Sequence, residues 1–124
     1  EILNGSLVCY DLKIKEKILG ISPRLIEKYT PESIEITEEL VKKAKKMFKS
    51  DIYVGCTGLL KRGGSESPDK PVGTFFYSIL YKNKLYNYRR LFKGNKEEKL
   101  SKLINSICKS LIKIIWKSLF NLSW

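Results

Sequence analysis

The 124-residue sequence predicts an α/β fold, in which helices flank a mixed sheet as in a three-layer sandwich. One observation is the set of strand-like apolar runs, at 6–10, 52–56, 75–81 and 85–92. A second is the group of amphipathic segments between the first two runs, and a third is the amphipathic segment after the last. The length suits one hydrophobic core, so we expect a single domain over residues 1–124.

The amino-terminal third predicts one strand and two short helices. Ser6 to Tyr10 is expected to form a short buried strand. A short helix from Asp11 to Leu19 follows, and Gly20 ends it. Ser22 before proline indicates an N-cap, so a second short helix is expected over 23–28.

The middle of the chain predicts a longer helix and a buried strand. Thr37 is the expected N-cap, because two glutamates follow it in the first turn. The apolar positions then lie on one helical face, at Leu40, Val41, Ala44, Met47 and Phe48. The next run, Ile52 to Cys56, has almost no polar interruption, which is typical of a strand covered on both faces.

The carboxyl-terminal part predicts a hairpin and a long helix. Lys82-Asn83-Lys84 separates two strand-like runs, and asparagine suits the turn. Asn95 is expected to cap the last helix, with Glu98 three residues later. Its apolar stripe widens near the end, where it meets either a second subunit or this domain's own sheet, at Trp116, Leu119 and Phe120.

Composition excludes several classes of function. The absence of histidine removes a histidine general base, a Ser-His-Asp triad and a histidine-bearing zinc site. The net charge of +11 comes mostly from lysine at helix-face spacing, so we do not expect sequence-specific nucleic-acid binding. Lysines through the last helix argue against a membrane span, and three unpaired cysteines suit a reduced, cytoplasmic protein.

A glycine-containing polar loop is the most informative feature. It begins at Thr57-Gly58, passes Gly63-Gly64 and closes on Lys-Pro-Val-Gly-Thr at 70–74. A loop of this composition after a buried strand is typical of ligand-contacting backbone in α/β proteins.

Four patches occur in an order that resembles the CinA C-terminal domain family, from about residue 4 to about 119. They are 4–10 with Lys15, 20–27, the glycine loop with its Lys-Pro-Val-Gly-Thr end, and 92–96. The best-known members of that family are nicotinamide-nucleotide amidases. The resemblance implies hydrolysis of nicotinamide mononucleotide to nicotinate mononucleotide and ammonia, without a metal. We expect no cofactor, and we expect a homo-oligomer.

The resemblance also implies roles for individual residues. Lys15, five residues after Tyr10, matches the lysine that activates a serine nucleophile, and alone it would be an ordinary surface lysine. Thr57 matches a threonine that holds phosphate or the oxyanion; otherwise it satisfies its own turn. Lys96 is placed to contact phosphate, and glycines let the backbone approach substrate, at Gly58, Gly63 and Gly64. We expect Lys15 and Thr57 to share one pocket.

The sequence also departs from the family pattern. The family's first strand and helix, with their Glu-Ser-Cys-Thr-Gly-Gly segment, have no match, and no serine replaces the nucleophile. We therefore expect a catalytically incomplete chain: a fragment, a product of a split or decayed gene, or one completed by a partner subunit. The alternatives are a non-catalytic nucleotide-binding or oligomerising module and a basic nucleic-acid-associated domain.

Overall fold

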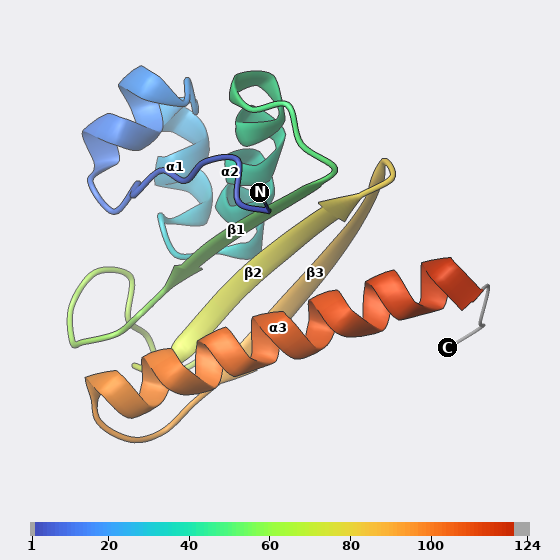
Figure 1. Ribbon diagram of the computed structural model, residues 1–124. Helices are drawn as coiled ribbons and strands as arrows, with labels where there is room; N and C mark the ends of the chain where they lie inside the picture. Colours follow the sequence, from blue (N-terminus) through green and yellow to red (C-terminus); the bar gives the residue numbers. More distant parts are fainter. Residues whose placement is uncertain (1, 121–124) are drawn as a thin grey trace.

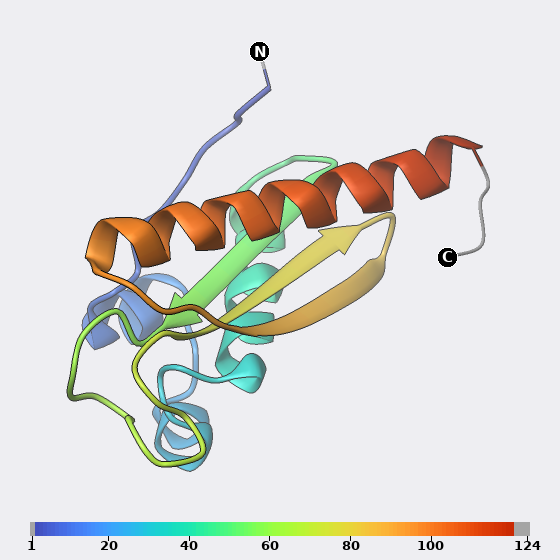
Figure 2. The same cartoon turned by 90° about the horizontal axis from the view of Figure 1, so that it is seen from below.

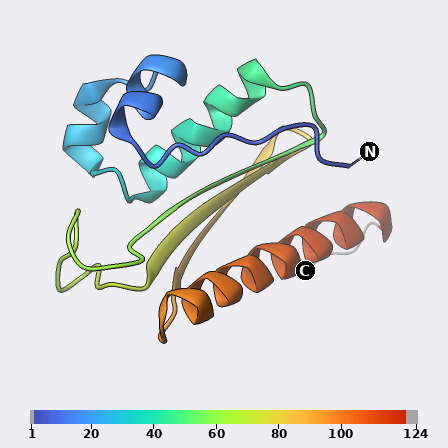
Figure 3. The same cartoon turned by 60° about the vertical axis from the view of Figure 1, so that its left-hand side comes forward.

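The computed structural model describes residues 2–120 and shows one sheet with helices on both faces (Figures 1 and 3). The elements are, in chain order, a π-helical turn η1 (Ile14–Ile18), α1 (Pro23–Tyr29), α2 (Ile34–Met47), β1 (Ile52–Gly58), β2 (Thr74–Tyr81), β3 (Lys84–Leu91) and α3 (Lys96–Phe120). The helices before β1 lie on one face and α3 lies on the other. The predicted α/β class and its three layers are confirmed.

The sheet is antiparallel throughout, in the order β1-β2-β3. The predicted mixed sheet is wrong, because the segment Ser6–Tyr10 forms no strand. The segment has little burial to stabilise it: Val8 is 84% and Tyr10 79% exposed. A short strand needs paired neighbours and a covered apolar face, and this segment has neither.

Strand β1 lies at one edge of the sheet. The prediction that both of its faces are covered is wrong. One face packs on α2, where a Cβ at Gly55 would lie 2.8 Å from Val41 Cγ2. On the other face Val54 is 42% exposed and Cys56 is exposed. The apolar sequence of β1 therefore does not mean that both faces of the strand are covered.

Helix α2 begins one turn earlier than predicted. Ser33, and not Thr37, is the N-cap: its Oγ accepts a hydrogen bond from Ile36 N at 3.3 Å. Ser33 has extended backbone, with φ −156°, and its hydroxyl donates to Thr30 O at 2.8 Å. Thr37 therefore lies inside the helix, fully buried.

Three other local predictions are confirmed, whereas the helix expected from Asp11 to Leu19 is only the π-helical turn η1. Ser22 caps α1 by accepting from Arg24 N. Lys82 and Asn83 adopt positive φ angles of 50° and 62°, as a tight hairpin turn requires. A capping box starts α3, where Glu98 N donates to Asn95 Oδ1 at 2.9 Å and Asn95 N donates to Glu98 Oε1 at 3.3 Å.

Two apolar clusters stabilise the layers. The first joins η1, α1 and α2 and contains Leu19, Ile21, Ile26, Ile36 and Leu40. The second lies between the sheet and α3 and contains Phe75, Tyr77, Ile79, Leu103 and Ile114. Within residues 2–120, no helix is both long and apolar enough to span a bilayer.

Candidate functional site

Several connections meet where β1 ends. The loop 59–73 leaves β1 there, and Lys99 of α3 reaches it by donating to Leu60 O at 2.8 Å. The same loop reaches the α1–α2 connection, because Lys70 Nζ donates to Thr30 Oγ1 at 2.7 Å and to Glu32 O at 2.6 Å. Figure 2 shows the loop extending past the end of the sheet toward α1. This end of the molecule brings together chain segments that are far apart in sequence.

Lys15 is buried, with 5% of the residue exposed, although lysine is usually a surface residue. Its Nζ donates to Cys9 O at 2.5 Å and to Tyr10 O at 3.2 Å. Two carbonyls therefore fix the amine, and a third direction around Nζ remains. An ammonium presents an N–H in that direction, and a neutral amine presents its lone pair.

Tyr10 takes part through its main chain. Its carbonyl is one of the two Lys15 acceptors, while its residue is 79% exposed. The structure therefore brings the two predicted catalytic residues together, with the phenol ring directed outward.

Cys9 lies near Lys15 and also near Cys56 of β1. Burial raises the pKa of the Cys9 thiol, and the charge of Lys15 lowers it by a smaller amount. Burial of the sulfur also raises the pKa of Cys56, although that residue is exposed overall, and Cys9 adds to the rise. Cys9 thus neighbours both Lys15 and Cys56, the residue before Thr57.

Thr57 lies on the same side of the sheet as Lys15, and its hydroxyl is already engaged. Thr37 Oγ1 lies 2.6 Å from Ser33 O and 2.9 Å from Thr57 Oγ1. A carbonyl only accepts, so the single Thr37 proton goes to Ser33 O. Thr57 must then donate to Thr37, and its own oxygen is left as an acceptor.

Local backbone structure or packing explains each of the three predicted glycines. The side of Gly58 where a Cβ would stand is filled by the Phe75 ring. Gly63 and Gly64 have φ angles of 105° and 59°, which glycine adopts with little strain. A Cβ at Gly64 would lie 3.0 Å from Glu32 Oε1, so this turn packs against the α1–α2 connection.

Lys96 is exposed in the first turn of α3, on the face of the sheet opposite α2 (Figure 3). The lysine that contacts the loop is Lys99, which is 8% exposed. The predicted residues thus fall into three places: Lys15, Tyr10 and Thr57 on the α2 side, the loop glycines beside Glu32, and Lys96 at the start of α3.

A polar cluster around Lys70 was missed by the sequence reasoning. Besides the two Lys70 bonds, Ser65 Oγ donates to Glu32 Oε2 at 2.6 Å. Burial lowers the pKa of Lys70, and Glu32 partly offsets this. Thr30 adopts φ 72° and ψ 154°, a strained conformation for a β-branched residue. Lys70-Pro71 in the loop was the available signal, but nothing in the sequence pairs it with Thr30.

Two hollows of the described chain do not reach Lys15 or Thr57. Their volumes are about 560 and 460 Å³, and other residues line them. Across residues 2–120, no three Cys, Asp or Glu side chains gather as metal ligands would.

Comparison with known proteins shows to which family this fold belongs. A family model described as the CinA C-terminal domain matches residues 1–115. The chain belongs to the CinA C-terminal domain family. The resemblance inferred from the sequence patches is therefore confirmed.

Relatives of this CinA C-terminal domain are longer proteins. A CinA-like protein of Petrotoga mobilis is 34% identical over 98 residues, which make up 78% of this chain and 24% of that protein. A CinA-like protein of Fervidobacterium nodosum is 35% identical over 97 residues, covering 77% and 23%. The chain thus spans about a quarter of the length of these relatives.

Solved structures agree with the CinA C-terminal domain fold. A competence or damage-inducible protein from Enterobacter asburiae superposes with a TM-score of 0.79 at 21% identity, covering 87% of this chain and 67% of that one. A CinA superfamily protein from Escherichia coli gives a TM-score of 0.63 at 27% identity, covering 71% and 51%.

Proposed function

We propose that this CinA domain carries the general base and the substrate-binding strand end of a nicotinamide-nucleotide amidase, and that it is catalytically incomplete as a 124-residue chain. The substrate is nicotinamide mononucleotide, and the products are nicotinate mononucleotide and ammonia. The observation that carries the proposal is the buried Lys15 amine, fixed by two carbonyls on the same side of the sheet as Thr57.

Lys15 is the proposed general base. Its two carbonyl acceptors take two N–H groups, so the neutral amine directs its lone pair in one remaining direction. There it accepts the proton of a nucleophilic hydroxyl as the oxygen attacks the carboxamide carbon. The resulting ammonium returns that proton to the departing nitrogen, so that ammonia leaves and an ester remains for water to hydrolyse.

The described chain offers Lys15 no nucleophile of its own. In residues 2–120 the Lys15 amine bonds to main-chain carbonyls and to no serine. Cys9 is its nearest thiol, but burial raises the pKa of Cys9, which keeps it in the less nucleophilic thiol form. The hydroxyl must therefore come from other polypeptide, which is why we propose an incomplete site.

Thr57 is the proposed contact to substrate oxygen. Because its proton is donated to Thr37 in this structure, binding of a phosphate or oxyanion requires the Thr57 hydroxyl to rotate away. That rotation exchanges one hydrogen bond for a charge-assisted one, which is the stronger kind. Three free cysteines in the described chain suit the expected cytoplasmic location.

The test combines binding and turnover. Calorimetry with nicotinamide mononucleotide should show binding by the wild-type chain, weaker binding by Thr57→Val, and unchanged binding by the exposed control Lys17→Ala. An ammonia assay should show no release above the level of Lys15→Ala. Absence of nucleotide binding would contradict the substrate assignment, and turnover abolished by Lys15→Ala would contradict the incomplete site.

The missing nucleophile also favours a second candidate, a non-catalytic nucleotide-binding module. It predicts the same binding with no ammonia release when a nucleophile segment from a relative is fused to the chain. Lysine-dependent ammonia release by that fusion would decide for the amidase.

A further inference from the structure

We propose that Thr37 is a positioning residue that makes the candidate site prefer a carboxamide to a carboxylate. Because Thr37 takes the proton of Thr57, it leaves the Thr57 hydroxyl only as a hydrogen-bond acceptor. A carboxamide has N–H groups to donate to such an oxygen, whereas a carboxylate has none. The inference rests on the proposed function, and it names the end of the nucleotide that meets Thr57.

The main chain of α2 fixes the orientation of the Thr37 hydroxyl. Thr37 is fully buried, so bulk water does not compete for its proton. Its Oγ1 lies 2.6 Å from Ser33 O, the carbonyl one turn earlier, in a bond that threonine commonly forms inside a helix. Ser33 O also accepts the main-chain hydrogen bond from Thr37 N at 3.0 Å. The Thr37 oxygen therefore keeps its lone pairs for a donor on β1.

A glycine lets strand β1 approach α2 closely enough for the two hydroxyls to meet. Gly55 and Thr57 point to the same face of the sheet, because side chains alternate along a strand. A Cβ at Gly55 would lie 3.2 Å from Thr37 O and 2.8 Å from Val41 Cγ2. In its absence, Thr57 Oγ1 lies 2.9 Å from Thr37 Oγ1. The contact thus follows from how the strand packs on the helix.

The position of the Thr57 proton decides which ligand groups Thr57 meets without rearrangement. An amide N–H donates to the Thr57 oxygen and leaves the bond to Thr37 intact. A carboxylate bonds to Thr57 only after the hydroxyl rotates and loses the bond to Thr37. The bond that the carboxylate gains is the same with or without Thr37. Thr37 therefore shifts the relative affinity by the value of one hydrogen bond, which is about threefold to tenfold.

The same hydroxyl also serves the proposed reaction. The nitrogen and the oxygen of a carboxamide share one carbon. Thr57 therefore accepts from the amide N–H in the bound substrate and, after rotation, donates to the oxyanion that forms on attack. The nicotinate product has lost that N–H, so the contact at Thr57 favours its release.

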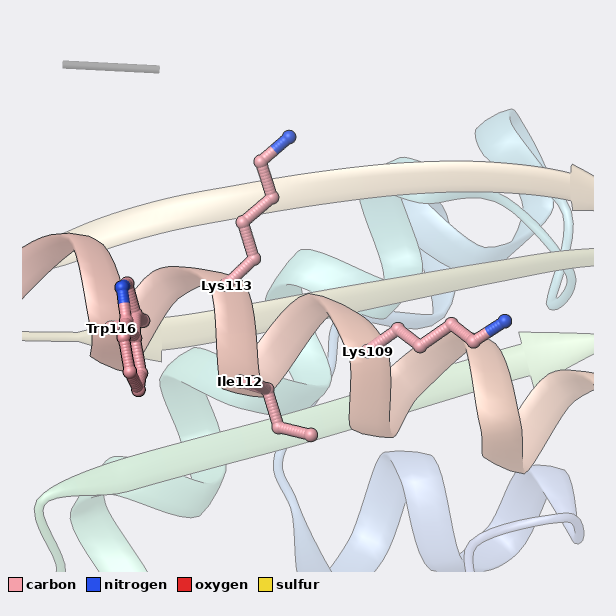
Figure 4. A pocket seen from close by; sticks show the side chains of 4 residues that line it. All are labelled: Lys109, Ile112, Lys113 and Trp116. Carbon is pink, nitrogen blue, oxygen red and sulfur yellow. The ribbon is translucent and has the colours of Figure 1, made fainter. Parts of the chain in front are cut away.

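The contact at Thr57 is separate from the larger hollow of the described chain. Thr57 is half-buried near the end of β1, so part of its surface is open to a ligand. The hollow of about 560 Å³ lies on α3, and the side chains that Figure 4 labels, Ile112 and Trp116 among them, all come from that helix. Helix α3 lies on the opposite face of the sheet from α2 (Figure 3). The hollow therefore offers a control position.

Calorimetry with nicotinamide mononucleotide and nicotinate mononucleotide tests the inference, because the two differ only in the carboxamide and the carboxylate. Thr37→Val keeps the side-chain shape, and Ser33 O keeps its bond from Thr37 N. It should lower the preference for nicotinamide mononucleotide about threefold to tenfold, mainly through tighter binding of nicotinate mononucleotide. Thr37→Ser should restore the preference. A merely structural role would weaken both nucleotides together.

Two further variants keep the test decisive if Thr37→Val fails to fold by circular dichroism. Thr57→Val, at the half-buried partner, should weaken binding of nicotinamide mononucleotide more than binding of nicotinate mononucleotide. Ile112→Ala, in the α3 hollow, should bind both nucleotides as the wild type does.

The outcomes separate this inference from the proposed function. An unchanged preference in Thr37→Val, or equal weakening of both nucleotides by Thr57→Val, would overturn the inference alone, because Thr57 would then contact the phosphate that both carry. A preference that Ile112→Ala alters as much as Thr37→Val would place the nucleotides in the hollow and overturn it too. If the wild-type chain and Thr37→Val bind neither nucleotide, the proposed function fails and this inference fails with it.

Discussion

The amine of Lys15 holds two main-chain carbonyls, those of Cys9 and Tyr10, in a place that excludes most water. Lys15→Met keeps the apolar stem and removes the donor. Because buried acceptors left without a partner are costly, we expect a loss of about 1–3 kcal/mol in the free energy of unfolding. Urea denaturation measures it.

Lys17→Met is the matched control, because Lys17 is exposed in the same turn. It should change the free energy of unfolding by no more than about 0.5 kcal/mol. Equal losses for the two variants would show that the Lys15 amine stabilises nothing, and that its bonds form without a net gain.

Alanine substitutions at Gly73 and Gly20 distinguish the stability cost of steric overlap from that of backbone strain. Both have positive φ, 96° and 71°, but a Cβ at Gly73 would collide with Phe92 O, whereas at Gly20 it would meet nothing within 4 Å. Gly20→Ala should cost about 1 kcal/mol of stability, from strain alone. Gly73→Ala should cost about 3 kcal/mol or more, because the Phe92 carbonyl is backbone and cannot turn aside. Thermal and urea unfolding compare the two, and similar costs would contradict the overlap.

At the scale of single residues, the sequence predicted which side chains belong to the candidate site better than it predicted what those side chains contact. Lys15 and Thr57 were found through the family resemblance, and both lie on the α2 side of the sheet. The Lys70 cluster was missed because it joins positions about 40 residues apart and depends on the positive φ of Thr30. Residues before proline usually adopt extended backbone with negative φ, so a positive φ at Thr30 could not be expected from Thr30-Pro31.

Among helices and strands, predictions held where the signal is local. The hairpin turn at Lys82-Asn83 and the capping box at Asn95 depend on a few neighbouring residues, and both are observed. The strand at Ser6–Tyr10 and the double cover of β1 depended on what packs beside them, which an apolar run does not reveal. The same limit explains the exposed arc of α3, whose exposure only the fold could show.

The start of α2 gives a test of capping. Ser33→Ala removes the acceptor of Ile36 N and the donor to Thr30 O, so it should cost about 1–2 kcal/mol and reduce helicity at the first turn. Ser101→Ala is the control, since Ser101 is exposed inside α3, where alanine is the better helix former. Circular dichroism during urea unfolding measures both. A loss for Ser101→Ala as large as for Ser33→Ala would contradict the cap.

For the molecule as a whole, alkaline pH should reveal how burial couples ionisation to stability. Burial raises the pKa of Cys9 and Cys56 above the ordinary thiol value of 9.0, and the pKa of Tyr88 above 10.0. The unfolded chain loses these protons first, so their contribution to stability is complete below pH 9 and is lost as pH rises through the folded values. Lys70 acts in the opposite direction, because its pKa is lowered and the folded chain releases its proton first.

Glu32 partly offsets the shift of Lys70, so we expect the thiols and Tyr88 to dominate. The urea midpoint should then fall between about pH 8.5 and 10.5, the range over which thiols and phenols titrate. A Cys9→Ala, Cys56→Ala double variant should be less stable at pH 8 but lose less as pH rises, since both thiol contributions are gone. Cys108→Ala is the control, because Cys108 is exposed on α3. Its stability should decline with pH as the wild type does. A wild-type midpoint that stays level or rises over this range would mean that Lys70 outweighs the thiols, and a double variant parallel to the wild type would place the decline elsewhere.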